Sequence, residues 1–494
     1  MKRLGVVLVV ACHGDPVIPP DSTADSSPDS ADSTPVDAAG PRDTYGAVSG
    51  TRLKLTWLEA VGGARVFKEL YDAERGEPCQ IVPGAGGTLL CAPIGLGAQI
   101  AYADASCTQP VVRARIADDC AMQPRYATEF DQESSCDSSV LTRLHTVGAP
   151  LVRASRYWTM SRGSCVGGGE DQPDFGTYAL GDGVSLDQLA QLTLGAPEGA
   201  GVRLQQRSYV SSDGMRLPMV RHDAALGVEC FFESERRTRQ CSLGGPASLG
   251  SESSDPACES HLATSRKDCP APVYAVESLS DACPGEAARS FAIGAQAPAS
   301  PLYTSSGDSC VATQANPGLD YYRVGATPVD LMELEPRLEG ADARIRNLAF
   351  TSTEGGQWHD RYNVFDTGLD TMCSLQTQPD GSIGCLPGGR ANAVVSTSYY
   401  LDASCTLPIS LVFVPDVAAR CGDLPLPRFA TQYAFHGACP ATNTAHAVES
   451  EHLDPVWQRD GTSCRLSRGS GRMFRVSAGL PPTTFGIAHV VTDP

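Results

Sequence analysis

Residues 79–91 read CQIVPGAGGTLLC, and residues 373–385 read CSLQTQPDGSIGC. Both stretches have a cysteine at each end and a turn sequence in the middle, centred on Ala85 in one and on Pro379 in the other. Two short halves around such a turn predict a β-hairpin. Cysteines placed evenly about the turn would face each other across the paired strands, at a separation that a disulfide tolerates. We therefore predict that a disulfide staples each hairpin.

The hairpin cysteines belong to a rhythm that recurs along the chain. Of the 19 cysteines, one is Cys12, and the other 18 fall into three sets of six with similar gaps between successive members. Recurrence at a period of about 145 residues indicates a tandem repeat. We expect the three copies at residues 50–199, 200–341 and 342–494. The sets are Cys79, Cys91, Cys107, Cys120, Cys136 and Cys165; Cys230, Cys241, Cys258, Cys269, Cys283 and Cys310; and Cys373, Cys385, Cys405, Cys421, Cys439 and Cys464.

The spacing also bears on how these cysteines are used. The four cysteines that follow the hairpin pair in each copy allow three pairings. We favour sequential pairing, third with fourth and fifth with sixth, because each bond then spans a short stretch with strand-like flanks. No two of the 18 are closer than 11 residues, so C-x-x-C patterns for zinc, haem or redox exchange are absent. We expect disulfides formed in an oxidising compartment, and no metal or cofactor. The predicted hairpin pairs are Cys79–Cys91, Cys230–Cys241 and Cys373–Cys385.

The composition indicates a turn-rich β protein. The 494 residues include 49 Gly and 36 Pro, and only 6% are aromatic. Strand-like alternation recurs at 52–57, 99–103, 111–116 and 394–401, whereas helical periodicity is strongest at 184–194. We therefore expect an all-β fold. The net charge of −19 argues against nucleic-acid binding, which requires a basic surface to neutralise phosphates.

One segment of the first copy resembles a blade of the kelch propeller family. Residues 58–63 read LEAVGG and are followed by the pair Tyr71-Asp72. In kelch blades a hydrophobic strand ends in a glycine pair and an aromatic–Asp pair follows, and the third copy keeps both elements. The resemblance implies a propeller-like ring of small sheets, stapled by disulfides. A linear array of β modules is the alternative.

The N-terminus resembles the signal of a bacterial lipoprotein. Residues 1–3 read MKR, an apolar run covers residues 4–11, and Cys12 follows a small residue, as in a lipobox. The resemblance implies a signal peptide at 1–11 and a Cys12 that carries lipid, including acyl chains such as palmitate. His13 stands where an aspartate would retain a lipoprotein at the inner membrane, so the outer membrane is favoured. A plain signal peptide is the alternative. Residues 12–49, rich in Asp, Ser and Pro, predict a disordered linker.

Candidate binding residues occupy repeated positions. An aspartate stands seven residues before the first cysteine of each copy, where it either closes a turn or ligates calcium or a substrate hydroxyl. An aromatic residue stands seven residues before each sixth cysteine; such residues belong to the core or, if exposed, suit stacking on sugar rings. Three arginines at the tip of the second hairpin could contact an anionic surface. These residues are Asp72, Asp223 and Asp366; Trp158, Tyr303 and Trp457; and Arg236, Arg237 and Arg239.

We therefore expect a lipid-anchored protein of the cell envelope whose β repeats bind or adhere to a glycan or a protein. The membrane is then a partner through the anchor, and nucleic acid is not. An enzyme acting on carbohydrates, or a structural envelope component, is the alternative. An enzyme needs converging carboxylates, for which an insertion in the first copy offers Glu170, Asp171 and Asp174. The pattern assigns no catalytic residue.

Overall fold

The computed structural model confirms the all-β class, and the part of the chain that it describes contains strands and short 3-10 turns but no α-helix. The segment 184–194, where helical periodicity is strongest, is the end of one strand, a 3-10 turn and a second strand. The N-terminal residues 1–45, including Cys12, lie outside the described part. The described residues are 46–93, 98–115, 124–131, 140–152, 156–161, 164–170, 175–199, 201–231, 240–243, 247–267, 269–276, 289–298, 300–306, 309–340, 343–354, 356–387, 393–415, 426–434, 442–460, 463–467 and 471–493.

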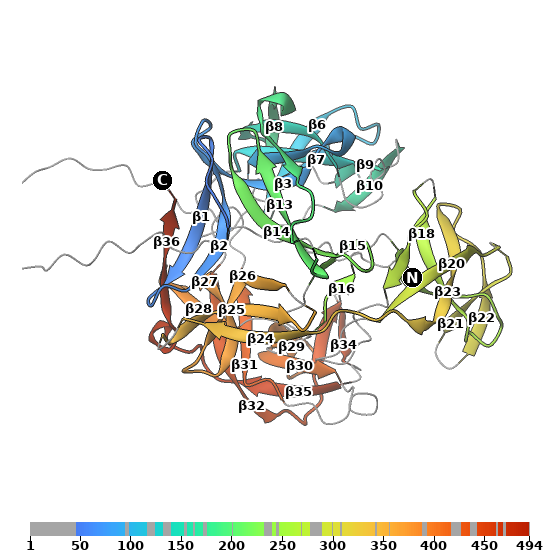
Figure 1. Ribbon diagram of the computed structural model, residues 1–494. Helices are drawn as coiled ribbons and strands as arrows, with labels where there is room; N and C mark the ends of the chain where they lie inside the picture. Colours follow the sequence, from blue (N-terminus) through green and yellow to red (C-terminus); the bar gives the residue numbers. More distant parts are fainter. Residues whose placement is uncertain are drawn as a thin grey trace, which may run out of the picture.

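Each copy contributes a meander of four antiparallel strands to one central sheet of 15 strands (Figure 1). The first meander is β1 (Leu53–Ala60), β2 (Arg65–Asp72), β3 (Glu77–Pro83) and β4 (Leu89–Pro93). The second is β13 (Leu204–Ser211), β14 (Arg216–Asp223), β15 (Val228–Phe231) and β16 (Ser242–Leu243). The third is β25 (Ile345–Ser352), β26 (Gln357–Asp366), β27 (Thr371–Thr377) and β28 (Ile383–Pro387).

Three tail strands, one at the end of each copy, join these meanders into a ring. β12 (Ala190–Leu194) pairs with β4 of its own copy and with β13 of the next. β36 (Ile487–Thr492) pairs with β28 and returns to β1. β24 (Leu334–Glu339) pairs with β25, and the backbone just before it meets β16, where the Cys241 amide donates to the Met332 carbonyl at 3.1 Å. This hydrogen bond and a bridge between Gln240 and Glu333 link the two end strands, and through them the central sheet closes into a ring.

This ring differs from the propeller that the kelch resemblance implies. A propeller is a circle of separate small sheets, whereas here one sheet continues from copy to copy through the tail strands. The kelch-like residues 58–63 form the end of β1 and the start of its turn toward β2. The difference arises because the tail strands β12 and β36 hydrogen-bond on both sides, which fuses the sheets that blades would keep apart.

Between its fourth strand and its tail strand, each copy inserts a satellite sheet of seven strands. Five strands close into a small barrel, and the other two form an outer hairpin on its first strand. The first satellite is β5 (Gln99–Tyr102), β6 (Pro110–Arg115), β7 (Tyr126–Asp131), β8 (Val140–Pro150), β9 (Arg156–Ser161), β10 (Ser164–Glu170) and β11 (Phe175–Val184). The second is β17 (Ala247–Ser253), β18 (His261–Arg266), β19 (Tyr274–Val276), β20 (Ser290–Gln296), β21 (Leu302–Ser306), β22 (Ser309–Thr313) and β23 (Leu319–Pro328). The third is β29 (Ala393–Tyr400), β30 (Pro408–Pro415), β31 (Phe429–Ala434), β32 (Thr442–Glu451), β33 (Trp457–Asp460), β34 (Ser463–Leu466) and β35 (Gly471–Val476).

The ring has three apolar cores, one at each junction between neighbouring copies. The first core combines Leu53 and Leu55 of the first copy with Leu217 of the second, around the disulfide Cys79–Cys91. The other two cores repeat this plan around Cys230–Cys241 and Cys373–Cys385. Because each core needs side chains from two copies, a single copy cannot bury its apolar surface alone.

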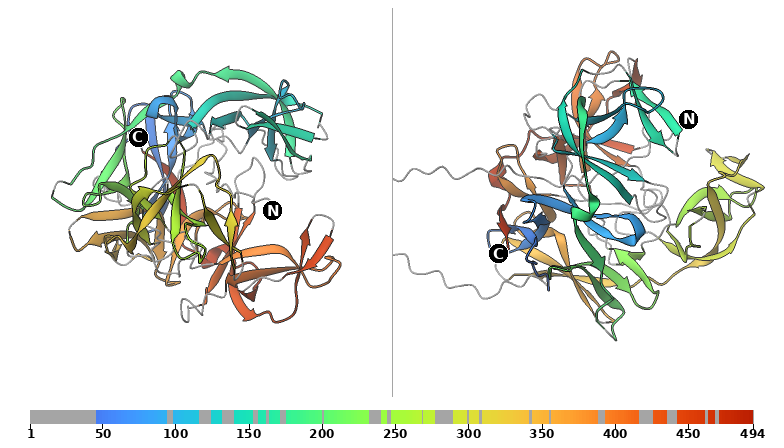
Figure 2. Two further views of the ribbon diagram at one scale, coloured as in Figure 1. Left: turned by 90° about the vertical axis from the view of Figure 1, so that its right-hand side faces the viewer. Right: turned by 90° about the horizontal axis from the view of Figure 1, so that it is seen from above.

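The satellites attach to the ring unequally. The first packs Leu141 and Leu144 against Val82 and Leu90 of the ring. The third packs Ala445 against Leu386 and Phe485. The second satellite, residues 247–328, projects from the ring, as Figures 1 and 2 show.

Candidate functional site

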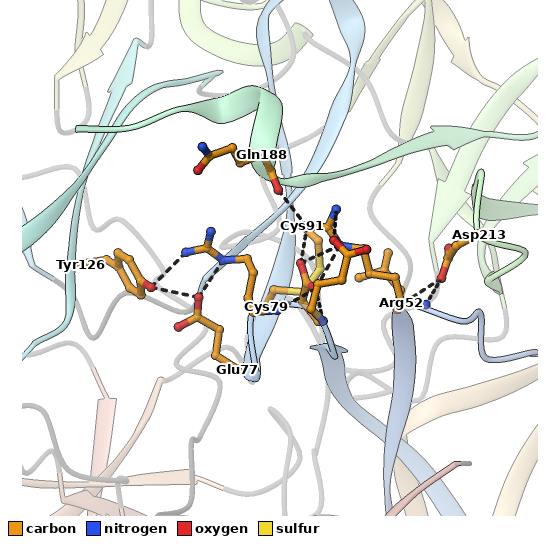
Figure 3. Close-up of polar contacts among 11 residues, drawn as sticks. Arg52, Glu77, Cys79, Cys91, Tyr126, Gln188 and Asp213 are labelled. Atoms are coloured by element: carbon orange, nitrogen blue, oxygen red, sulfur yellow. Dashed lines mark hydrogen bonds and ion pairs between the residues drawn. A yellow bond between two sulfur atoms is a disulfide. The ribbon is translucent and has the colours of Figure 1, made fainter. Parts of the chain in front are cut away.

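The repeated aspartates close turns and bind arginines. Asp72 is fully buried, and its Oδ1 accepts hydrogen bonds from the backbone amides of Glu74 (3.1 Å) and Arg75 (3.3 Å). The Arg52 guanidinium donates to both carboxylate oxygens, with Nε 3.0 Å from Oδ1 and Nη2 2.7 Å from Oδ2 (Figure 3). The hydrogen bond to Asp72 is the main cause that raises the pKa of Arg52. Asp72 is thus a structural residue and has no exposed oxygen for a ligand.

The same Arg–Asp staple recurs in the other copies. Arg203 holds Asp223, and Arg344 holds Asp366, each with Nε 3.0 Å from Oδ1. Each arginine also donates to a backbone oxygen just before the tail strand: Arg52 to Gln188, Arg203 to Asp330 and Arg344 to Thr484. Sequence reasoning did not select these arginines. Their signal is a fixed offset, because they precede the aspartates by 20, 20 and 22 residues.

The hairpin disulfides are present, but with a shifted register. Cys79–Cys91, Cys230–Cys241 and Cys373–Cys385 have Cα–Cα distances of 5.3, 5.4 and 5.2 Å. Cys79 lies opposite Pro93 and not opposite Cys91, so the two cysteines are diagonal neighbours. The turn is centred one residue later than the midpoint, at Gly86, whose φ of 69° is a left-handed conformation that glycine adopts easily.

The sequential pairing that we favoured for the other cysteines is wrong for the third and sixth. These two bond to each other, with Cα–Cα distances of 5.6, 5.8 and 5.8 Å. The reason is a long-range strand pairing: Tyr102 of β5 pairs with Trp158 of β9, which brings the outer hairpin beside the turn after β5. Cys269 is also disulfide-bonded. The bonds are Cys107–Cys165, Cys258–Cys310 and Cys405–Cys464, while Cys12, Cys120, Cys136, Cys283, Cys421 and Cys439 lie outside the described residues.

An aspartate builds the turn that carries each third cysteine. Cys107 has a φ of 52°, and Cys258 and Cys405 have 57° and 53°. Asp104 shapes the first of these turns, because its carboxylate accepts bonds from the Gln109 amide (2.7 Å) and the Thr108 amide (2.9 Å). Desolvation raises the pKa of Asp104, but the hydrogen bonds outweigh it and lower that pKa to about 2. The carboxylate is therefore used for structure.

The aromatic position before each sixth cysteine lies on the outer hairpin. Trp158 is on β9, Tyr303 on β21 and Trp457 on β33, and all three are half-buried. They are thus neither core residues nor fully exposed. Apolar side chains beside them are exposed, among them Met160 (44%) and Leu466 (47%). Each hairpin combines an accessible aromatic residue with a disulfide that fixes it to the satellite.

A polar cluster occurs at the ring–satellite junction of the first copy. Glu77 Oε1 accepts bonds from Arg75 Nε (2.8 Å) and the Tyr126 hydroxyl (3.0 Å), as Figure 3 shows. Arg125 Nη1 lies 3.2 Å from Oε2. Burial is the main cause that raises the pKa of Tyr126. The polar groups of this cluster are hydrogen-bonded or ion-paired to one another, so the cluster holds the first satellite against the ring. Equivalent positions hold Leu226 and Val228 in the second copy and Leu369 and Thr371 in the third.

The remaining candidate residues lie outside what is described. These are Arg236, Arg237, Arg239, Asp171, Asp174 and the side chain of Glu170. Among the described residues, no group of three or more His, Cys, Asp or Glu side chains is arranged to hold a metal ion. The same residues include no helix that is long and apolar enough to span a membrane.

The fold and its disulfides suggest an extracytoplasmic protein built from three β repeats. Residues 37–423 match the model of a family of unknown function, DUF7481, and the chain belongs to this family. No curated protein and no solved structure matches the chain.

Proposed function

We propose that this protein is a binding or adhesion module of the cell envelope. In this proposal, a lipid attached to Cys12 anchors the protein in a membrane, and the outer membrane is favoured over the inner one. Residues 12–49 form the linker between the lipid and the repeats. The β repeats bind a glycan or an envelope protein through the outer hairpins. The observation that carries the proposal is the recurrence of one hairpin design, a half-buried aromatic residue on a disulfide-fixed strand pair, in all three copies.

The hairpin design suits binding for two physical reasons. A cross-link such as Cys107–Cys165 limits the conformational freedom of the hairpin, so less entropy is lost when a ligand binds. Aromatic side chains supply large contact areas with few rotatable bonds, which makes them effective binding residues. The same reasoning makes binding the stronger proposal over catalysis, because the repeated carboxylates, such as Asp72 and Asp104, are used to hold turns.

The test is a binding screen with the exported chain, purified as the Cys12→Ser variant so that no lipid is attached. We expect saturable binding to a glycan on an array or to a protein in an envelope extract, with the ligand recovered unchanged. Release of shortened sugar products would instead support the carbohydrate-active enzyme. Binding to neither array nor extract would overturn the proposal.

The anchor is tested separately. The natural chain should incorporate labelled fatty acid and sediment with membranes, and Cys12→Ser should do neither. Persistence of the label in the variant would overturn lipidation at Cys12.

A further inference from the structure

The outer hairpin of the first satellite has an arrangement of its own around Trp158. In the β9–β10 register, Trp158 lies opposite Gly167, and Arg156 lies two residues before Trp158 on the same face of β9. A Cβ atom placed on Gly167 would lie 3.8 Å from Trp158 Nε1 and 3.8 Å from Arg156 Nη2. Gly167 therefore places no side chain beside the pyrrole edge of the indole, and the Arg156 guanidinium lies next to the same point.

The other two hairpins fill the corresponding position. Tyr303 lies opposite Ala312, and Trp457 lies opposite Leu466, so both cross-strand positions carry a side chain where the first hairpin has Gly167. In the third hairpin the nearby guanidinium of Arg459 is used within the fold, since its Nη2 donates to the Cys405 carbonyl at 2.7 Å. Among the three described hairpins, the first combines a tryptophan, which the third shares, with the smallest cross-strand neighbour and a guanidinium beside that neighbour.

This combination matches the chemistry of a sugar ring. One face of a pyranose ring carries C–H groups, which pack well on the electron-rich face of an indole. Its rim carries oxygen atoms, which accept hydrogen bonds from a guanidinium. We infer that the β9–β10 hairpin is a subsite for one sugar ring of a glycan chain, which stacks on Trp158 while Arg156 donates to its oxygens. The inference rests on the proposed binding function and names the ligand class.

The size of the surface favours a glycan over a protein partner at this hairpin. Strands of six and seven residues give a face of roughly 20 Å by 10 Å. A stable protein–protein interface covers about 800 Å² on each partner, which is several times more. A single sugar ring, in contrast, is small enough to cover the part of this face that carries Trp158 and Arg156.

The experiment is a titration of the exported full chain with neutral, N-acetylated and uronic-acid hexasaccharides, followed by calorimetry. We expect saturable binding of at least one, weakened about tenfold or more by Trp158→Ala, which removes the indole, and by Gly167→Leu, which places a bulky side chain beside it. Gly167 has no left-handed φ, and a side chain there meets ordinary van der Waals distances, so leucine is tolerated by the backbone. Phe130→Ala is the matched control and should change the affinity less than twofold, because this exposed aromatic residue lies on β7 of the same satellite and outside the outer hairpin.

The outcomes separate the two proposals. Binding that survives Gly167→Leu, or that is lost equally with Phe130→Ala, would overturn the subsite. If no hexasaccharide binds but an envelope protein does, the subsite is overturned while the proposed function stands. If neither a sugar nor an envelope protein binds, both are overturned.

Discussion

The Arg–Asp staples of the ring and the outer hairpins of the satellites each occupy equivalent positions in all three copies. The staples keep the same residues in every copy, whereas the hairpins change theirs. The staples are chemically identical: an arginine binds a fully buried aspartate and a backbone oxygen before the tail strand. The hairpins share a disulfide but differ in what they expose, with Gly167, Ala312 or Leu466 beside the aromatic residue. The comparison teaches that this chain repeats the residues that close the ring and varies the residues beside the aromatic position of the outer hairpins.

The largest effect is expected at a staple. Asp223→Ala removes a buried carboxylate from Arg203, whose side chain is only 10% exposed, so a buried cation loses its partner and stability should fall by about 3 kcal/mol. Glu354→Ala is the matched control: Glu354 binds the same arginine at 3.0 Å but is 51% exposed, so the loss should stay below about 0.5 kcal/mol. Denaturant titration measures both. Equal losses would show that burial does not govern the staple.

A smaller effect is expected at the ring–satellite junction, where the copies differ. Tyr126→Phe removes a hydroxyl that donates to the buried Glu77 at 3.0 Å, and we expect a loss of about 1.5 kcal/mol. Tyr274→Phe in the second copy is the counterpart, because that hydroxyl makes a long 3.4 Å bond to the Leu226 carbonyl. Thermal unfolding compares the two variants. A larger loss for Tyr274→Phe would contradict the view that polar contacts fix the first satellite in particular.

Substitutions at the variable position of the outer hairpins should change stability less than substitutions at the staples, because this position is exposed and the staple aspartates are buried. Gly167→Leu should leave stability unchanged or raise it by about 0.5–1 kcal/mol, since glycine within a strand is unfavourable. Leu466→Gly in the third hairpin should lower stability by a similar amount. Hydrogen exchange of β9 and β33 reports each change locally. Strong destabilisation by Gly167→Leu would mean that the glycine is required by the fold.

The smallest effect is a dependence on acid at the cysteine turns. Hydrogen bonds lower the pKa of Asp104 to about 2, below the value of about 3.9 in an unfolded chain. A lowered folded-state pKa gives stabilisation that is complete above about pH 4 and is lost as the pH falls toward 2. Carboxyl NMR should find the Asp104 midpoint at about 2 in the native chain and at the ordinary value in urea. An Asp104 midpoint at the ordinary value in the native chain would contradict the hydrogen bonds from the Thr108 and Gln109 amides.

Part of the fold could be predicted because it is local. The disulfide Cys79–Cys91 follows from two cysteines around a turn, and the strand at 99–103 follows from alternation. The shift of the hairpin register could not be predicted, since it depends on which residue of the turn adopts the left-handed conformation. At the candidate site, the sequence pattern selected the position of Trp158. It did not show that Gly167 lies opposite Trp158, because the two residues meet only when β10 pairs with β9.

The sequence by itself determined the all-β class, the threefold recurrence of cysteines and the hairpin disulfides, because these depend on composition and on contacts within a dozen residues. The tertiary structure alone decided the closed ring, the Cys107–Cys165 type of bond and the Arg52–Asp72 staple with its contact to Gln188. Each of these joins segments that are far apart in the chain. Their pairing is set by which strands share hydrogen bonds and which apolar faces are buried together, and no local pattern contains that information.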